Sequence, residues 1–248
     1  MQYISCMYQP KMPRFHLDAP LAPRQTLALP APVVRHVQVR RMQPGQDITL
    51  FNGAGGQWRA RIEHMGRSSV SVQVTAFEDV EREAARPVHL GCGLIDASRF
   101  DWLVEKACEL GAASLTPLRL ARSHAPGNAA RRAERWRSIA AAASEQCGRN
   151  RLMEIRAPCP LGEWFASLHN SAQRLVLDFD GAPLRPNEGS TAPLALLSGS
   201  EGGLTDDERA AARAAGFAPA SLGNRTLRAE TAPLAALAAV SLACATAA

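Results

Sequence analysis

The sequence of 248 residues lacks the short motifs of the commonest nucleotide-binding and metal-binding proteins. No G-K-[ST] occurs, which excludes a P-loop, and no G-x-G-x-x-G occurs, which excludes the ordinary dinucleotide-binding turn. The six cysteines form no C-x-x-C pair and the six histidines show no ligand spacing, so we expect no metal. A nucleotide bound by this chain must be held by another kind of loop.

Signals for secretion or membrane insertion are also missing. The N-terminal stretch MQYISCMYQPKMPRF has no continuous apolar region of the kind a signal peptide needs. The most apolar segment, APLAALAAVSLACATAA, is short for a bilayer span and fits a packed helix better. We therefore expect a cytoplasmic protein with reduced cysteines that does not enter a membrane.

The charge balance leaves nucleic acid open as a partner. The 28 Lys and Arg residues exceed the 23 Asp and Glu residues, for a net charge of +5. Such an excess is compatible with a polyanionic partner, and equally with an arginine-rich composition that reflects a GC-rich genome. The hydrophobic content of 46% is ordinary for a globular protein with a core.

Residues 14–80 are predicted to be β-structure. DITLF and QWRARIEHM flank the glycine-rich run 52–56, which suits a hairpin turn, and SVSVQVTAF alternates with period two. No helix follows these glycines, which favours a turn over a nucleotide-binding loop. The charged stretch 78–87 marks a boundary, so we expect one domain over 1–80 and a second over 81–248.

Beyond the boundary, apolar strands alternate with helical patterns, which predicts an α/β domain with a mostly parallel sheet. We expect Ser98 to cap the first helix and Thr205, in a T-x-x-E capping box, to cap a later one. The expected strands are 88–94, 114–120, 174–179 and 193–198, and the expected long helix is 127–147.

Three polar loops follow successive strands of this second half, at 178–183, 198–203 and 222–231. Ligands of open α/β sheets bind at the carboxyl ends of strands, and glycines let the backbone approach a ligand closely. Such loops suit a nucleoside, whose rings apolar neighbours would cover. Ser200 does not fit the nucleophile of a hydrolase, because the G-x-S-x-G pattern needs a glycine two residues earlier, where this chain has Ser198.

Several of these stretches together resemble one family. SEQCGRNR (144–151), SGSEGGL (198–204) and LGNRTLRAETA (222–232) are similar in order and spacing to motifs of the bacterial small-subunit ribosomal RNA uridine-N3 methyltransferases (RsmE). The segment 104–118 resembles a helix-strand segment of that family, and 43–62 resembles its N-terminal module. The likeness covers nearly the whole chain.

The resemblance implies an S-adenosylmethionine-dependent enzyme of the SPOUT superfamily. It would methylate N3 of a specific uridine in 16S ribosomal RNA of the small ribosomal subunit. The implied fold is a knotted parallel-sheet methyltransferase domain with a trefoil knot, preceded by a small PUA-like β-barrel that binds RNA. A homodimer built on the knotted domains is implied as well. Pattern alone predicts no knot, since knots are rare.

The polar loops, the arginine-rich stretches and the resemblance together give the expected site residues. Expected in cofactor binding are Leu197, Ser198, Gly199, Glu201, Gly202, Leu222, Gly223, Leu227 and Thr231. Expected in catalysis are Arg225, Arg228 and Glu230, and expected to contact RNA are Arg131, Arg132, Arg135, Arg149 and Arg151. The arginines would stabilise negative charge or grip phosphate, while Glu230 would be either the base or the group that holds an arginine.

Two positions depart from the family pattern. Ser200 stands where the family usually has proline, and Asp96 stands where it often has lysine, which makes a phosphate contact there doubtful. Two alternatives stay open: a SPOUT methyltransferase acting on transfer RNA or a ribose 2′-hydroxyl, and a non-catalytic RNA-binding assembly factor.

Overall fold

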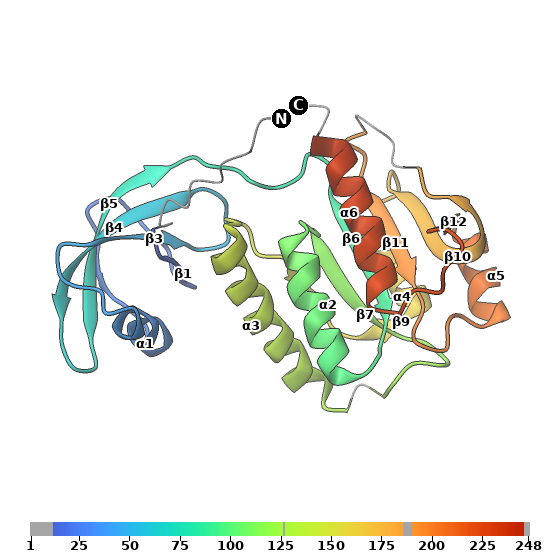
Figure 1. Ribbon diagram of the computed structural model, residues 1–248, viewed down its shortest axis with the longest axis horizontal. Helices are drawn as coiled ribbons and strands as arrows, with labels where there is room; N and C mark the ends of the chain where they lie inside the picture. Colours follow the sequence, from blue (N-terminus) through green and yellow to red (C-terminus); the bar gives the residue numbers. More distant parts are fainter. Residues whose placement is uncertain (1–11, 126, 186–189, 246–248) are drawn as a thin grey trace, which may run out of the picture. The chain divides into compact units, whose positions relative to one another are not determined.

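The computed structural model describes residues 12–125, 127–185 and 190–245, and most of the N-terminal stretch examined for a signal peptide lies outside them. The chain divides into two compact units (Figure 1). Unit 1 comprises Met1–Arg82 and Gly148–Arg151, and unit 2 comprises Glu83–Cys147 and Leu152–Ala248. The short segment 148–151 thus groups with unit 1, although the sequence assigned it to the second domain.

Unit 1 is built on a five-stranded sheet in the order β1-β3-β4-β5-β2. The strands are β1 (Arg14–His16), β2 (Thr26–Ala28), β3 (Asp47–Phe51), β4 (Gln57–Met65) and β5 (Val70–Glu78). Strands β3 and β4 form the predicted antiparallel hairpin, and Gly53 in its turn has a φ of 82°. Antiparallel pairing joins β4 to β5 and β5 to β2, while β1 pairs with β3 in parallel.

The prediction of continuous β-structure over 14–80 is wrong at α1 (Ala31–Val39). The buried residues of α1 are Val33, Val34 and Val37, a helical spacing that turns one face toward the core. A proline lies in the first turn of α1, where its missing N–H costs no hydrogen bond.

The segment 148–151 is held within unit 1 by guanidinium groups. Nη2 of Arg14 donates to the carbonyl oxygen of Arg149 at 3.0 Å and to Oδ1 of Asn150 at 2.7 Å. Nη1 of Arg82 donates to the carbonyl oxygen of Gly148 at 3.2 Å. These bonds are formed by residues more than sixty positions away in sequence, so the local pattern did not indicate them.

Unit 2 contains a seven-stranded sheet in the order β12-β10-β11-β6-β7-β8, with β9 also paired to β7. All of its strand pairs are parallel, as the sequence predicted. The strands are β6 (Val88–Gly93), β7 (Ser114–Arg119), β8 (Glu154–Ile155), β9 (Cys159–Pro160), β10 (Gln173–Pro183), β11 (Leu194–Ser198) and β12 (Ala218–Ser221).

Helices cover both faces of this sheet. Helices α2 (Ala97–Glu109), α3 (Ala129–Cys147) and α6 (Thr231–Ala245) pack with Leu194 and Leu196 in one core, on the side nearest the viewer in Figure 1. Helices α4 (Leu161–Ser167) and α5 (Asp206–Ala214) pack on the other face, against Ala195 and Leu197. Strand β11 is therefore buried on both sides, which explains its unbroken apolar run.

The predicted caps of α2 and α5 have different outcomes. Thr205 caps α5 in the full capping box with Glu208, as predicted. The prediction for α2 is wrong, because Asp96 is its N-cap and accepts hydrogen bonds from the backbone N–H groups of Ser98 and Arg99. These bonds lower the pKa of Asp96, the hydroxyl of Ser98 being the largest cause. Asp96 thus serves a helix terminus.

Candidate active site

A cavity of about 570 Å³ lies between residues 177–179 of β10 and the loops after β11 and β12. These strands are neighbours in the sheet, so their carboxyl ends lie at one edge. Parts of the three segments that the sequence singled out are thereby brought together. The prediction of a loop at 178–183 is wrong, because these residues belong to β10. The wall consists of residues 177–179, 198–204, 220–223 and 225–229, with Arg99, Arg209 and Ala232.

The glycine-rich loop after β11 is folded tightly upon itself. A Cβ added at Gly199 would lie 3.0 Å from the backbone of Gly203, whose N–H donates to the carbonyl oxygen of Ser200 at 2.9 Å. The end of β6 approaches equally closely, because a Cβ at Gly93 would lie 2.5 Å from the backbone nitrogen of Ser200. Backbone therefore forms much of this wall, and side chains do not separate it from a ligand.

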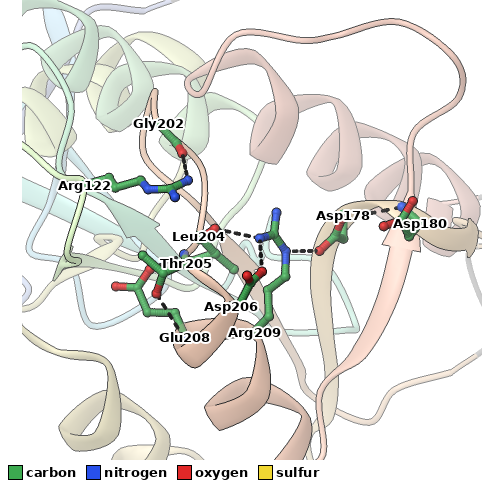
Figure 2. Close-up of polar contacts among 9 residues, drawn as sticks. All are labelled: Arg122, Asp178, Asp180, Gly202, Leu204, Thr205, Asp206, Glu208 and Arg209. Atoms are coloured by element: carbon green, nitrogen blue, oxygen red, sulfur yellow. Dashed lines mark hydrogen bonds and ion pairs between the residues drawn. The ribbon is translucent and has the colours of Figure 1, made fainter.

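Ser200 and Arg122 fasten this loop to the segment after β7. The hydroxyl of Ser200 donates to the carbonyl oxygen of Arg122 at 2.8 Å. Nη1 of Arg122 in turn donates to the carbonyl oxygen of Gly202 at 3.0 Å, a bond drawn in Figure 2. The backbone N–H of Ala121 donates to Oε1 of Glu208 at 2.7 Å, which ties the same segment to α5. Arg122 thus holds the loop at two positions, Ser200 and Gly202.

Glu201 is already held by the side chains of Arg99 and His124. Its Oε1 lies 3.1 Å from Nη1 of Arg99, and its Oε2 lies 2.8 Å from Nε2 of His124. All three groups are partly exposed, so the pairs stabilise the fold only weakly, but they fix the carboxylate beside the cavity.

A second brace joins the end of β10 to the start of α5 (Figure 2). Nε of Arg209 donates to Oδ2 of Asp178 at 2.8 Å, and its Nη1 donates to the carbonyl oxygen of Leu204 at 2.7 Å. The hydrogen bond that Arg209 donates to Asp178 raises the pKa of Arg209, so this guanidinium is charged at every physiological pH. Asp178, Leu204 and Arg209 all line the cavity.

The loop after β12 contributes the predicted catalytic side chains. Arg225 and Arg228 line the cavity and are exposed to solvent. Glu230 does not line it and is only 6% exposed. Its Oε1 lies 4.0 Å from Nη1 of Arg228, and its Oε2 has no hydrogen-bond partner among the described residues. The carboxylate thus stands behind Arg228, away from the ligand space.

Seven of the nine residues expected to bind cofactor line the cavity, and two do not. Leu197 points to the other face of β11 and is buried in the core with α4 and α5. Thr231 begins α6 and is not part of the cavity wall. The residues brought together there are Ser198, Gly199, Glu201, Gly202, Leu222, Gly223 and Leu227.

The arginines expected to contact RNA fall into two groups. Arg131, Arg132 and Arg135 line a shallow depression of about 400 Å³ at the start of α3, where Arg135 also forms an ion pair with Asp101 at 2.7 Å. Arg149 lies in unit 1 and is 5% exposed, so its side chain is not presented to solvent.

Arg151, also in unit 1, forms an ion pair with Glu81 at 2.7 Å. Its guanidinium also donates to the carbonyl oxygen of Ala54 at 2.9 Å, next to the turn between β3 and β4. Half of the side chain is exposed, so this arginine is held in place and still reaches solvent.

The sequence analysis missed the wall residues Phe179 and Arg209, and also Arg122, which bonds to the wall at Gly202. Phe179 belongs to a segment that was predicted to be a polar loop, and its aromatic side chain within that segment was the available signal. Arg122 and Arg209 carried no signal, because both act through contacts with distant segments.

Two kinds of site are absent from the part of the chain that the structure describes. No group of three or more His, Cys, Asp or Glu side chains there is arranged to hold a metal ion. Over the same residues, no helix has both the length and the apolar character that a membrane span requires.

Family models match both parts of the chain. A model described as an RNA methyltransferase domain matches residues 82–241, and one described as an RNA methyltransferase PUA domain matches residues 29–75. Curated relatives named ribosomal RNA small subunit methyltransferase E include one from Synechocystis, 33% identical over 88% of this chain and 75% of its own length. Another, from Bacillus subtilis, is 30% identical over 87% of this chain and 90% of its own length.

Solved structures give the same likeness. A ribosomal RNA small subunit methyltransferase E from Neisseria gonorrhoeae, bound to S-adenosyl methionine, is 31% identical with a TM-score of 0.88, covering 93% of this chain and 97% of that one. A putative methyltransferase from Legionella pneumophila, in complex with the same cofactor, is 32% identical with a TM-score of 0.86, covering 94% and 98%.

Proposed function

Because the chain belongs to the ribosomal RNA small subunit methyltransferase E family, we propose that it transfers a methyl group from S-adenosylmethionine to 16S ribosomal RNA of the small ribosomal subunit. The acceptor atom is N3 of a uridine, as the motifs at 144–151, 198–204 and 222–232 imply. The observation that carries the proposal is the cavity at the carboxyl ends of β10, β11 and β12, built from those last two motifs.

The cavity fits S-adenosylmethionine in size and chemistry. Its volume of about 570 Å³ is within the range of small-molecule sites. The backbone of 198–203 offers hydrogen-bonding groups to an adenine edge, and Leu222 and Leu227 offer apolar cover for its rings. When bound there, the cofactor supplies an electrophilic methyl group on a sulfonium. Glu201, held by Arg99 and His124, is placed to attract positive charge.

The side chains at the cavity then have to align the acceptor and manage one proton. Uridine N3 carries a weakly acidic proton, and loss of that proton leaves negative charge on the ring and its carbonyl oxygens. Arg225 and Arg228 are exposed at the cavity and supply positive charge to stabilise this anion or to grip a flanking phosphate. Because N3 lies on the Watson–Crick edge, the target base must be unpaired or flipped out.

Glu230 acts as a positioning residue for Arg228. It lies outside the cavity wall, is buried, and faces Arg228 at 4.0 Å, which favours contact with that guanidinium over contact with a base. Its negative charge favours one placement of the guanidinium beside the ligand. Proton removal from N3 then relies on charge stabilisation by the arginines, and water takes up the proton.

The finer architecture follows from the same family. We extend the parallel-sheet domain to a trefoil-knotted SPOUT domain over 81–248, and unit 1 to a PUA-like β-barrel over 1–80 that binds RNA. The match of a PUA family model to 29–75 supports the second assignment. A homodimer is supported by the exposed apolar side chains of Trp102 and Leu242 on neighbouring helices α2 and α6.

RNA binding away from the cavity is assigned to Arg131, Arg132 and Arg135 at the start of α3, and to Arg151 in unit 1. Lys and Arg contacts to phosphates release counterions, so affinity for RNA should fall steeply with salt. The substrate is ribosomal, and we therefore place the protein in the cytoplasm.

Isothermal titration calorimetry with S-adenosylmethionine tests the proposal. Saturable binding with one cofactor per chain is expected, and absence of heat at millimolar cofactor would remove the enzyme function and leave a non-catalytic RNA-binding factor. Mass spectrometry of the methylated nucleosides separates uridine N3 from a ribose hydroxyl, and a comparison of substrates separates 16S ribosomal RNA from transfer RNA.

A further inference from the structure

The cavity has a deep part and a rim, and these differ in chemistry. In the deep part, the side chains of Ser198 and Leu204 are buried. At the rim, one large apolar side chain is left in solvent: Phe179 is 61% exposed although it belongs to the cavity wall. The guanidiniums of Arg225 and Arg228 are exposed at the same cavity.

An irregularity in β10 presents Phe179 at this place. The pairing between β10 and β12 is interrupted between Leu177 and Ala182, so the residues between them leave the regular ladder. Bulges of this kind redirect side chains and are common beside active sites. The close approach is possible because Gly181 has no Cβ, which would lie 2.5 Å from the backbone nitrogen of Ala220.

The preceding residue fixes the position of the bulge. The carboxylate of Asp178 is mostly buried and accepts the hydrogen bond from Arg209 at 2.8 Å, and Arg209 is itself bonded to the carbonyl oxygen of Leu204 (Figure 2). The backbone that bears Phe179 is therefore tied to the glycine-rich loop. The ring is presented by an anchored segment, although the ring itself is exposed.

The exposure of the ring indicates which ligand it meets. A small cofactor enters the cavity whole and is covered on most of its surface by buried groups. The acceptor is part of a polymer and approaches from solvent, so exposed groups at the rim are the first that its base meets. Exposed aromatic rings bind unstacked bases through their π-faces, and arginines beside them bind the backbone phosphates.

We propose that Phe179 is the stacking platform for the acceptor base at the mouth of the cofactor cavity, and that the Asp178–Arg209 ion pair positions it. This inference rests on the proposed function and names the residue that holds the unpaired pyrimidine of the RNA. The ring covers one face of the base and leaves its Watson–Crick edge free to turn toward the cofactor.

Steady-state kinetics with the full-length protein test this assignment. The concentrations of unmethylated small ribosomal subunits and of S-adenosylmethionine are varied separately. Phe179→Ala should raise KM for the subunits roughly tenfold or more, as loss of one base–aromatic stack does, and should leave the calorimetric Kd for S-adenosylmethionine within twofold. Phe179→Trp should restore KM, because indole also stacks. His169→Ala, which removes an exposed ring of unit 2 outside the cavity wall, is the matched control and should change neither value.

The positioning pair has its own variant. Arg209→Met should raise KM for the subunits in the wild-type background and should have little further effect in Phe179→Ala, because both changes remove the same contact. Additive effects of the two substitutions would overturn the positioning role.

Other outcomes would overturn the platform itself. A parallel loss of cofactor affinity in Phe179→Ala would assign the ring to the cofactor subsite. A change of oligomeric mass in light scattering would assign it to an interface between copies. If the wild-type enzyme is active and Phe179→Ala leaves KM for the subunits unchanged, the stacking platform alone is refuted. If the wild-type protein neither binds S-adenosylmethionine nor methylates RNA, the proposed function is refuted.

Discussion

The hydroxyl of Ser200 donates a hydrogen bond to the carbonyl oxygen of Arg122 at 2.8 Å, across 78 positions of sequence. Arg122 completes the connection through its own bond to the carbonyl oxygen of Gly202. In the family pattern a proline ring stiffens the loop at this position, and here a side-chain hydrogen bond restrains it. The glycine-rich loop is thus held in shape by tertiary contacts.

Removal of this hydroxyl should weaken cofactor binding. In Ser200→Ala the loop loses one partly buried hydrogen bond, so we expect the Kd for S-adenosylmethionine to rise about threefold to tenfold in calorimetry. Ser138→Ala, which removes a bond to the carbonyl oxygen of Glu134 within exposed α3, is the control and should leave Kd unchanged. Equal affinity in both variants would mean that Ser200 does not restrain the loop.

Gly93 should be intolerant of any side chain. A Cβ there would lie 2.5 Å from the backbone nitrogen of Ser200, and backbone cannot move aside as a flexible side chain can. Gly93→Ala should therefore lose most of its cofactor affinity while circular dichroism reports a folded protein. Gly162→Ala in α4 is the matched control, because its added Cβ meets no atom within 4 Å. Wild-type affinity in Gly93→Ala would show that the loop shifts without consequence.

The location of the site could be predicted because it depends on strands alone. The apolar runs that became β10 and β11 are unmistakable, and parallel strands place their following loops at one edge. The same runs hid the orientation of Leu197. A strand buried on both faces is apolar at every position, so its pattern does not tell which side chains face the cavity.

The sequence pattern could not predict contacts between segments that lie far apart in the chain. Arg122 and Arg209 are unremarkable arginines in the sequence, and only the register of β7 and α5 against the loops gives them partners. The two other wrong predictions, a strand at α1 and Ser98 as the cap of α2, concern segments in which two local structures compete. The valines of α1 favour strand until their burial on one helical face outweighs propensity, and Asp96 precedes Ser98 as an equally good cap.

The stability of the protein should fall as the pH is lowered because of His89. Burial, and next the charge of Arg156, lowers the pKa of this imidazole in the folded state, so protonation favours the unfolded chain. The loss should begin near the ordinary value of 6.5 and be complete below the lowered pKa. In urea unfolding, His89→Gln should flatten this dependence, and an identical slope in both proteins would contradict the assignment.

Glu230 should behave as a positioning residue and not as the base. Removal of a general base costs about 100-fold or more in kcat, whereas Glu230→Gln should cost less and should leave the pH profile of kcat unchanged in shape. Arg228→Gln should reduce kcat at least as strongly, and the double variant should be no worse than Arg228→Gln. A change in the shape of the kcat profile in Glu230→Gln would identify the carboxylate as the base.

The most direct measurement of the central claim is mass spectrometry of nucleosides from unmethylated small ribosomal subunits, after incubation with the purified protein and S-adenosylmethionine. The cavity at β10, β11 and β12, with its cofactor loop and exposed arginines, predicts 3-methyluridine in 16S ribosomal RNA at one site per subunit. Methylation at a ribose hydroxyl, or no methyl transfer while the cofactor binds, would contradict it.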